Sequence, residues 1–133
     1  MSIRKLWQSG TLLYLMDYKM MYKQLAIHWV DLEPTIGSET QKKRPCVILQ
    51  SDLINIGSRT IIIAPILPHH KDWPFVINIF PSKANGLDKE RHINLKQIRV
   101  VDISRVGKKQ ACIEDQYIHD IQKILKMVFA ISE

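Results

Sequence analysis

The sequence predicts a mainly β protein with one C-terminal α-helix, folded as a small barrel or a curled antiparallel sheet that the helix caps. Two observations support this prediction. From Ala26 onward, short apolar runs alternate with turn signals rich in Gly, Pro, Ser and Asn, as in a succession of short strands. After Glu114 the apolar residues change to a spacing of three and four, which is typical of one face of a helix.

The first four strands follow from their residue types. Ala26–Leu32 is an apolar run that ends at a loop containing Pro and Gly, residues 33–38. Pro45–Gln50 begins with a proline, which lacks a backbone N–H and is tolerated at the first position of a strand. Thr60–Ile66 is β-branched almost throughout and predicts a strand buried on both faces. Phe75–Phe80 is the fourth apolar run.

The second half of the chain adds further strands and the helix. The residues Lys-Ala-Asn-Gly at 83–86 predict a turn, His92–Ile103 predicts one or two strands, and Lys109–Ile113 predicts another. Glu114–Ser132 predicts an amphipathic helix, with acids in its first turn and lysines near its end that complement the helix dipole. Its apolar stripe is formed by Ile118, Ile121, Leu125 and Val128.

Length and composition limit the class of protein. The chain has 133 residues, of which 46% are hydrophobic and 24% charged, as in one globular domain. Its 19 Lys and Arg against 13 Asp and Glu give a charge of +6, which favours an anionic partner and nucleic acid first. The two cysteines, Cys46 and Cys112, exclude a disulfide framework and a four-cysteine zinc site. They are typical of a reducing compartment, so we expect a cytoplasmic protein.

Neither membrane insertion nor export is expected. The longest apolar runs are far shorter than the roughly 20 residues that a bilayer span needs, and the N-terminus has no signal-peptide pattern. Residues 1–26 differ from the rest, with four basic residues, one acid, four Met and three Tyr. We predict that they form a loosely ordered extension, with a helix over residues 12–24 as the alternative. Residues 27–133 are then the folded domain.

The most informative polar stretch is the predicted loop between the first two strands. It ends in three consecutive cations, residues 42–44, where the second strand begins. Arg44 is held by that strand, and its planar guanidinium can bind a phosphate through two hydrogen bonds. The polar candidates beside it are Ser38, Glu39, Thr40 and Lys43. A solvated loop with a cationic end is the alternative interpretation.

A second basic region spans residues 83–109, where eight cations face three acids. It would suit a surface that follows a nucleic-acid backbone. Trp29, Trp73 and Phe75 could stack bases, although core packing is the commoner role of a strand aromatic. No His, Cys or carboxylate group has metal-ligand spacing, and adjacent His69 and His70 are poorly placed to share one ion. We therefore expect no metal and no cofactor.

The order of these pieces resembles the MazF/PemK family of toxins from bacterial toxin–antitoxin systems. The resemblance runs from Ile27 to the C-terminal helix and rests on several separate blocks. These blocks are Trp29–Glu39, Lys43–Leu49, Gln50–Leu53, Arg59–Pro65, Trp73–Phe75, Gln97–Asp102, Ser104–Arg105 and Lys108–Lys109.

The resemblance implies an SH3-like barrel of five or more strands with a C-terminal helix, working as a homodimer. It also implies a metal-independent endoribonuclease that cuts single-stranded RNA at short sequences and is blocked by a MazE-type antitoxin. Arg44 matches the family's Arg-Pro arginine and is expected to stabilise the phosphorane. The residues expected to bind substrate are Trp29, Ser38, Glu39, Thr40, Lys43, Gln97 and Arg99.

One departure from the family pattern affects the expected activity. Many members end the strand that matches Thr60–Ile66 with a Thr or Ser that contacts the scissile phosphate, whereas this chain has Leu67. The second hypothesis is therefore a catalytically impaired homologue that still dimerises and binds antitoxin or RNA. A topoisomerase poison of the CcdB type, which shares the barrel, is the third. The Arg44-Pro45 pair and the block at residues 97–99 favour action on RNA.

Overall fold

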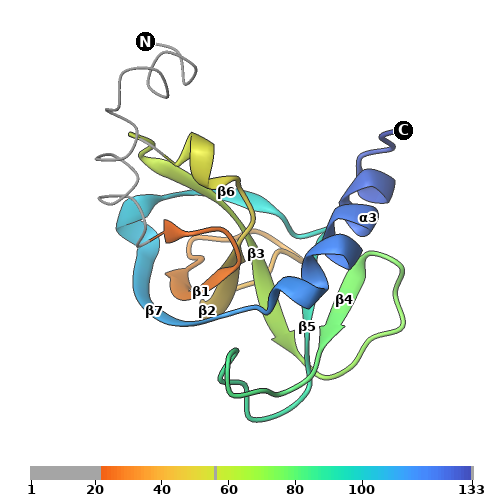
Figure 1. The fold of residues 1–133 in the computed structure, drawn as a ribbon. Helices are drawn as coiled ribbons and strands as arrows, with labels where there is room; N and C mark the ends of the chain where they lie inside the picture. The colour runs from red at the N-terminus through yellow and green to blue at the C-terminus, as the bar shows by residue number, and fades with distance from the viewer. Residues whose placement is uncertain (1–21, 56, 133) are drawn as a thin grey trace, which may run out of the picture.

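The computed structural model describes residues 22–55 and 57–132, which form a strongly curled antiparallel sheet with a helix against one end (Figure 1). The strands are β1 (Ala26–Asp31), β2 (Lys43–Ile48), β3 (Thr60–Pro68), β4 (Val76–Ile79), β5 (Arg91–Asn94), β6 (Arg99–Asp102) and β7 (Val106–Cys112). The long helix is α3 (Ile118–Val128), and the short 3₁₀ turns are η2 (Asp52–Ile54), η3 (Ile103–Arg105) and η4 (Asp115–Tyr117). The predicted fold class, mainly β with a C-terminal helix, is confirmed.

Strand β3 is the centre of the sheet. The strand order is β4-β5-β3-β2-β1-β7, and β6 also pairs with β3. The first part of β3 pairs with β2 and β6, while its last residues, Ile66–Pro68, pair with β5. Among the described residues no ladder joins the outer strands β4 and β7, so the sheet curls without closing into a complete barrel. The bend in β3 brings the β1–β2 loop toward β5.

The strand boundaries differ from the prediction in one informative place. Strand β2 begins at Lys43, so the prediction that Pro45 opens the strand is wrong. Pro45 pairs with Trp29 of β1, but the ladder to β3 begins only at Cys46. The missing N–H of the proline therefore falls just outside that ladder. The predicted segment His92–Ile103 is two strands, β5 and β6.

The C-terminal helix is shorter than the prediction of Glu114–Ser132. It begins at Ile118 after the 3₁₀ turn η4 and ends at Val128. Ala130 has a positive φ of 53° and donates its N–H to the carbonyl of Met127 at 3.1 Å, while Ile131 donates to that of Lys126 at 2.8 Å. These two bonds form a Schellman cap, which turns the chain away from the helix axis. In residues 22–55 and 57–132, no helix combines the length and apolar character needed to cross a membrane.

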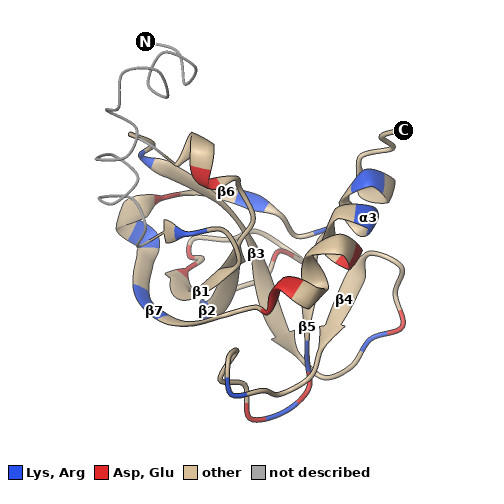
Figure 2. Ribbon diagram, in the orientation of Figure 1, with Lys and Arg blue, Asp and Glu red and all other residues tan. Residues whose placement is uncertain are grey.

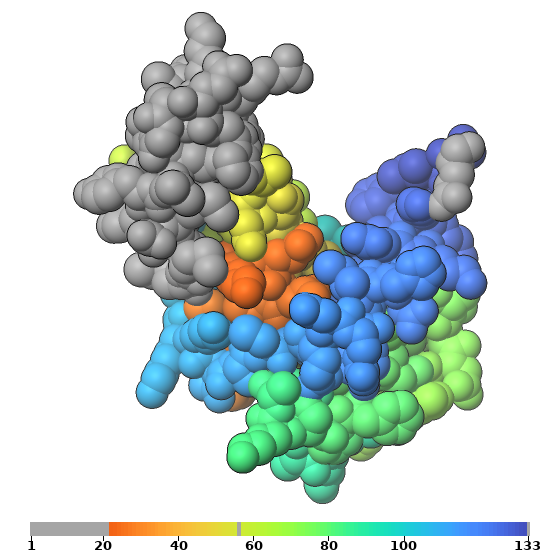
Figure 3. Space-filling model, viewed as in Figure 1, coloured from red at the N-terminus to blue at the C-terminus, as the bar shows by residue number. Residues whose placement is uncertain are grey.

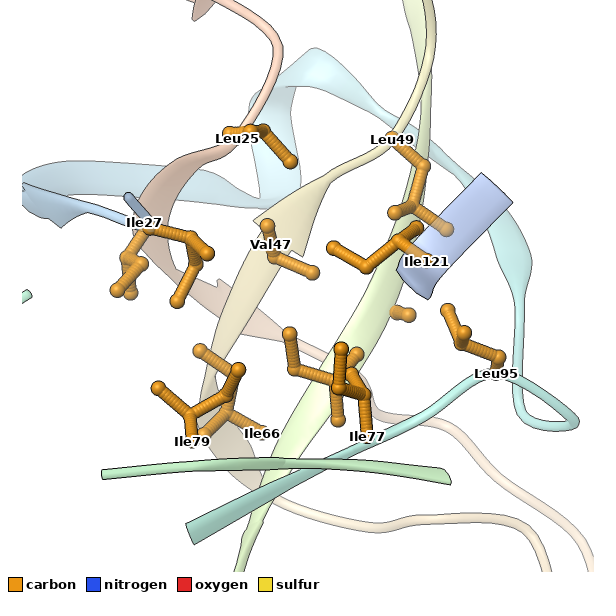
Figure 4. Close-up of a cluster of buried hydrophobic side chains, with 12 residues drawn as sticks. Leu25, Ile27, Val47, Leu49, Ile66, Ile77, Ile79, Leu95 and Ile121 are labelled. Atoms are coloured by element: carbon orange, nitrogen blue, oxygen red, sulfur yellow. The ribbon is translucent and has the colours of Figure 1, made fainter. Parts of the chain in front are cut away.

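Two apolar clusters fill the curled sheet. The larger lies between β3, β4, β5 and α3, and Ile121 is the buried contribution of the helix (Figure 4). Its other buried members are Leu25, Ile27, Val47, Leu49, Ala64, Ile66, Ile77, Ile79, Ile93, Leu95 and Ile113. The second cluster lies on the opposite side of β1 and β2 and includes Val30, Cys46 and Ile48. The predicted apolar strands therefore supply the core, and the end of α3 projects from it (Figure 3).

The described part of the predicted N-terminal extension is packed against the domain. Leu25 is buried in the larger cluster, and its N–H donates to the carbonyl of Ile48 at 2.8 Å. Gln24 donates its N–H to Asp52 Oδ1 and its side-chain amide to the carbonyl of Leu49, both at 2.7 Å. Residues 1–21, which hold most of the alternative helix over 12–24, lie outside the described residues.

Candidate nucleic-acid groove

Two adjoining hollows lie between the β1–β2 loop, the β3–β4 loop and β5, and we refer to them together as the groove. The larger measures about 500 Å³ and the smaller about 140 Å³. Both are lined by Thr40, Lys96 and Gln97. The larger is also lined by Ser38, Leu67, Pro68, His69, Lys71, Trp73, Phe75, His92 and Asn94, and the smaller by Leu32, Glu39, Pro65, Ile98 and Arg99.

The floor of the groove comes from the pairing of β3 with β5. Leu67 pairs with His92, one position beyond the core pair of Ile66 and Ile93. Because successive side chains of a strand point to opposite faces, Leu67 and His92 face the groove while their neighbours face the core. The predicted position of Leu67, at the end of a strand that leads into a groove, is confirmed.

His92 is a buried polar residue of this floor and is only 2% exposed. Its Nδ1 lies 2.8 Å from the carbonyl oxygen of His69, which can only accept a hydrogen bond. Nδ1 therefore carries the proton, and Nε2 is an acceptor in the neutral ring. Nε2 has no hydrogen-bond partner among the described residues. This leaves an unused acceptor beneath the groove.

The β3–β4 loop forms an aromatic wall. The rings of Trp73 and Phe75 are stacked with centroids 5.5 Å apart and an interplanar angle of 24°. Lys71 Nζ lies 5.1 Å from the Trp73 ring centre, and Lys96 Nζ lies 5.2 Å from that of Phe75. The wall therefore consists of two aromatic rings, each capped by a cation, which is the composition that single-stranded nucleic acid favours.

Polar contacts hold this loop in place. Asn78 of β4 accepts the N–H of Lys71 at 3.1 Å and donates to its carbonyl at 2.9 Å. His70 lies 2.7 Å from Asp72 Oδ1 and 3.1 Å from Glu90 Oε2. Hydrogen bonds to Glu90 first and Asp72 second raise the pKa of His70, so the protonated ring favours this arrangement. The loop that carries Trp73 is thus fixed at several points.

The β1–β2 loop forms the opposite rim. Ser38 and Thr40 line the larger hollow, and Glu39 lines the smaller one. The backbone N–H of Thr40 donates to Gln97 Oε1 at 3.4 Å, and Glu39 Oε1 accepts the N–H of Ile36 at 3.3 Å. The structure therefore brings five predicted substrate-binding residues to one groove. They are Ser38, Glu39, Thr40, Gln97 and Arg99.

Two distant arginines fasten the base of this loop. Arg99 Nη1 donates to the carbonyl of Leu32 at 3.0 Å. Arg105 Nη1 donates to the carbonyl of Asp31 at 3.3 Å and also to that of Glu33. These are charge-assisted bonds to main-chain oxygens, so both arginines set the position of the loop.

We expect Arg105→Gln to loosen the β1–β2 loop, because the shorter amide cannot reach both carbonyl groups. Hydrogen exchange at the amides of residues 36–42 should speed up by about 10-fold or more, since one charge-assisted bond is worth roughly 1.5–3 kcal/mol. The matched control is Arg91→Gln, because the guanidinium of Arg91 donates to exposed Asp88 and not to the β1–β2 loop. Unchanged exchange in Arg105→Gln would show that the loop is held without this residue.

Arg44 lies in β2 opposite Val30 of β1, and its Nε donates to the carbonyl of Gln41 at 3.2 Å. The last pair between β2 and β3 is Cys46 with Pro65. The ladder between β2 and β3 ends there, two residues after Arg44, and Arg44 is not among the residues that line either hollow. The predicted catalytic residue therefore lies on the strand that follows the β1–β2 loop, next in the chain to the rim of the groove.

The thiol of Cys46 reports the local electrostatics. Burial raises its pKa to about 12, while the positive charges of Arg99 and Arg44 oppose that rise. Both guanidinium groups therefore act on the same thiol. Of the two, Arg99 lines the smaller hollow, where its charge would stabilise an anion.

Two predicted substrate-binding residues lie elsewhere. Trp29, which is 42% exposed, and Lys43 line a separate hollow of about 280 Å³ with Arg105 and Gly107. The second basic region is also divided, because its Lys and Arg residues lie on β5, β6, η3, β7 and the loops beside β5 (Figure 2). The basic run therefore does not form one continuous strip.

Sequence reasoning missed three groove residues as binding candidates, namely Lys71, His92 and Asn94. A signal for two of them exists in β5, where His92 and Asn94 alternate with apolar Ile93 and Leu95. Alternation of this kind indicates one core face and one polar face. The described residues contain no group of three or more His, Cys, Asp or Glu side chains that could hold a metal ion.

Comparison with known proteins was made for sequence and for structure. Residues 23–129 match the sequence family described as PemK-like, MazF-like toxin of type II toxin-antitoxin system. The chain is 28% identical over 115 residues to endoribonuclease EndoA of Bacillus subtilis (strain 168), covering 86% of this chain and 99% of that protein.

Solved structures are similar in fold. The Mycobacterium tuberculosis toxin MazF-mt6 superposes with a TM-score of 0.69 at 15% identity, covering 81% of this chain and 99% of that one. MazF of Deinococcus radiodurans gives 0.68 at 19% identity, with coverages of 82% and 96%. A MazE–MazF structure from the same organism gives 0.67 at 18% identity, with coverages of 84% and 98%. At these identities the similarity establishes the fold alone.

Proposed function

Because this chain belongs to the PemK-like, MazF-like family of toxins of type II toxin–antitoxin systems, we propose that it is an endoribonuclease that cleaves single-stranded RNA sequence-selectively in the groove. One observation carries this proposal. The β1–β2 loop, which leads directly into the strand of Arg44, forms one rim of a groove whose opposite wall is aromatic and cationic. A phosphate and its neighbouring bases would both find partners there.

The reaction requires no group outside the chain and the RNA. The 2′-hydroxyl of one nucleotide attacks its own phosphorus, the bond from phosphorus to the 5′-oxygen of the next nucleotide breaks, and a cyclic phosphate and a 5′-hydroxyl result. A base removes the proton of the 2′-hydroxyl, and an acid protonates the leaving oxygen. Arg44 stabilises the charge that builds on the phosphorane oxygens, because its two parallel donors match two of them.

The remaining predicted residues have distinct positions relative to this phosphate. Ser38 and Thr40 offer hydroxyl groups from the rim, and Glu39 offers a carboxylate that accepts a proton or a base N–H. Gln97 and Arg99 hold the rim and line the smaller hollow. We assign the separate hollow of Trp29 and Lys43 to RNA further along the strand, because an exposed ring beside cations suits a second stacking contact.

A second candidate function is binding of RNA or antitoxin without cleavage. Leu67 favours it, because its side chain cannot form a hydrogen bond with a phosphate. The relative EndoA is named an endoribonuclease and is matched over nearly its whole length, which favours catalysis. Action on a topoisomerase, the third hypothesis, has no observation of its own in the groove. The single residue Leu67 therefore lowers the expected rate and does not change the proposed reaction.

The proposed partners follow the same family. An apolar groove of about 580 Å³ lies between α3 and the edge of β3 and β6, beside exposed Val100 and Phe129. An exposed apolar face of this size is typical of a protein–protein contact, and we assign it to a second copy of the chain in a homodimer. We assign a MazE-type antitoxin as the inhibitor. With RNA as substrate, the site of action is the cytoplasm.

Cleavage is expected to survive removal of metal ions. The groove has one carboxylate, that of Glu39, and the described residues contain no cluster of His, Cys, Asp and Glu that could hold a metal ion. Purified protein incubated with a long single-stranded RNA in excess chelator should release the same fragments at the same rate as without chelator. Cleavage that stops in chelator and returns with a divalent ion would contradict the proposed mechanism, and no cleavage in either condition would contradict the proposed function.

A further inference from the structure

We propose that the wall formed by Trp73 and Phe75 is a nucleobase subsite, in which one base of the RNA stacks on the aromatic pair and donates an N–H to His92 Nε2. This inference rests on the proposed function, since it concerns how RNA lies in the groove. It assigns roles to side chains that the predicted set of substrate-binding residues does not contain.

The first argument is the order of the stack. Each ring has two faces, and Trp73 and Phe75 cover one face of each other. The two lysines lie over these rings, Lys71 on Trp73 and Lys96 on Phe75. Each ring therefore has one aromatic neighbour and one ammonium group near its centre. Trp73 is nonetheless 46% exposed, so part of its surface remains open to a base.

The second argument is that a base can displace a lysine from the aromatic ring while the charge of that lysine remains useful for binding RNA. A lysine ammonium is a point charge on a flexible stem, so it can leave the ring and bind the phosphate that accompanies the incoming base. Stacking of a base on an aromatic side chain is stronger than an exposed cation–π contact. The lysine thus covers the ring in the free protein. When RNA binds, it contributes to binding of the RNA phosphate backbone.

The third argument is the unused acceptor beside the stack. The ring of His92 lies edge-on to Trp73, with centroids 6.2 Å apart and planes at 84°. Its Nδ1–H is engaged with the carbonyl of His69, which leaves Nε2 as an acceptor without a partner among the described residues. A buried acceptor left unpaired is costly, and every nucleobase carries an N–H or amino donor on its pairing edge. Because Nε2 is itself covered, a base against Trp73 would satisfy it by displacing the side chains that cover it.

The experiment compares binding of two strands by the full chain. One is a pool of random-sequence 2′-O-methyl oligoribonucleotides of about 12 nucleotides, which have no free 2′-hydroxyl and are not cleaved. The other is a 2′-O-methyl strand of the same length without bases. Fluorescence anisotropy gives the affinity for each. Trp73→Leu should weaken binding of the base-bearing pool by about 10-fold, as expected for one stacked base, and leave binding of the abasic strand unchanged.

Two controls match the two parts of the proposal. Phe80→Leu removes another exposed aromatic ring, which lies outside the groove, and should change neither affinity. His92→Asn keeps a donor for the carbonyl of His69 but removes Nε2, and it should weaken binding of the pool by about 5-fold. His119→Asn, on the exposed surface of α3, should have no effect.

The outcomes separate this inference from the proposed function. Equal losses on both strands would mean that Trp73 acts through the backbone or the fold, and would overturn the subsite. Binding of the pool by Trp73→Leu within 2-fold of the parent would also overturn it, while cleavage of ordinary RNA by the parent would leave the proposed function standing. Loss on the base-bearing pool alone supports the subsite even in a protein that cleaves slowly.

Discussion

Replacing Arg44 with alanine is expected to lower the rate of RNA cleavage by about 100-fold or more, equivalent to about 2.7 kcal/mol of transition-state stabilisation. The physical reason is the loss of the paired donors that meet two phosphorane oxygens. The fold should survive, because Arg44 is only half-buried and its side chain has one hydrogen bond, to the carbonyl of Gln41. Single-turnover rates of parent and variant on one RNA give the comparison, and circular dichroism checks the fold.

Lysine at the same position separates charge from geometry. Arg44→Lys keeps the positive charge but offers a point charge in place of a planar fork, so it should not restore the parent rate. Lys43→Arg is a matched control, because it adds a guanidinium next to the site without filling the position of Arg44. Parent-like rates in both Arg44→Ala and Arg44→Lys would remove Arg44 from the proposed mechanism.

Replacing Leu67 with threonine is expected to raise the rate of cleavage by about 10-fold or more. Leu67 faces the groove floor beside His92 and can neither donate nor accept a hydrogen bond. A hydroxyl there would meet a phosphate oxygen with one charge-assisted bond, worth roughly 1.5–3 kcal/mol. RNA affinity should change little, because the bond strengthens as charge develops in the transition state. The free energy of unfolding should fall by less than about 2 kcal/mol, since Leu67 is half-buried.

The control for this variant is Leu53→Thr, at an exposed leucine of η2 outside the groove, which should leave the rate unchanged. A parent enzyme that Leu67→Thr leaves unchanged or slows would show that another group already fills the role. Ser51 and His69 are the nearest candidates from the sequence. The hydroxyl of Ser51 accepts the N–H of Leu53 as the cap of η2, whereas His69 lines the groove, so His69 would be examined next.

The order of strands and the closing helix could be predicted because each depends on local patterns. β-branched runs, Pro and Gly at turns, and the change of spacing after Glu114 are all visible within short windows. Boundaries were harder, because they depend on which neighbour a strand pairs with. The start of β2 at Lys43 and the end of α3 at Val128 follow from a ladder and a cap that involve residues outside those windows.

The site was predictable on the β1–β2 loop and only in part on the opposite wall, where base stacking by Trp73 and Phe75 was one of two interpretations and His92 was not a candidate. Loop residues such as Ser38 and Thr40 are adjacent in sequence to Arg44, so a local motif identifies them together. His92 and Lys96 reach the same groove only because β5 pairs with the end of β3, about 25 residues away in sequence. The roles of Arg99 and Arg105 were missed for the same reason, since their partners are 67 to 74 residues distant.

The way the β1–β2 loop is fastened bears on how readily the protein could acquire a new target sequence. Three side chains bind main-chain atoms at the loop. Arg99 donates to the carbonyl of Leu32, and Arg105 donates to those of Asp31 and Glu33. Gln97 accepts the N–H of Thr40. Main-chain oxygens and N–H groups are present whatever side chain a residue carries, proline excepted. Most of residues 35–41 can therefore exchange side chains while the loop keeps its path. The exceptions are Gly37, which has a φ of 57°, and Glu39, whose carboxylate accepts the N–H of Ile36. The RNA sequence that is recognised can therefore change, by natural drift or in a randomised library, while the hydrogen bonds that hold the loop stay the same.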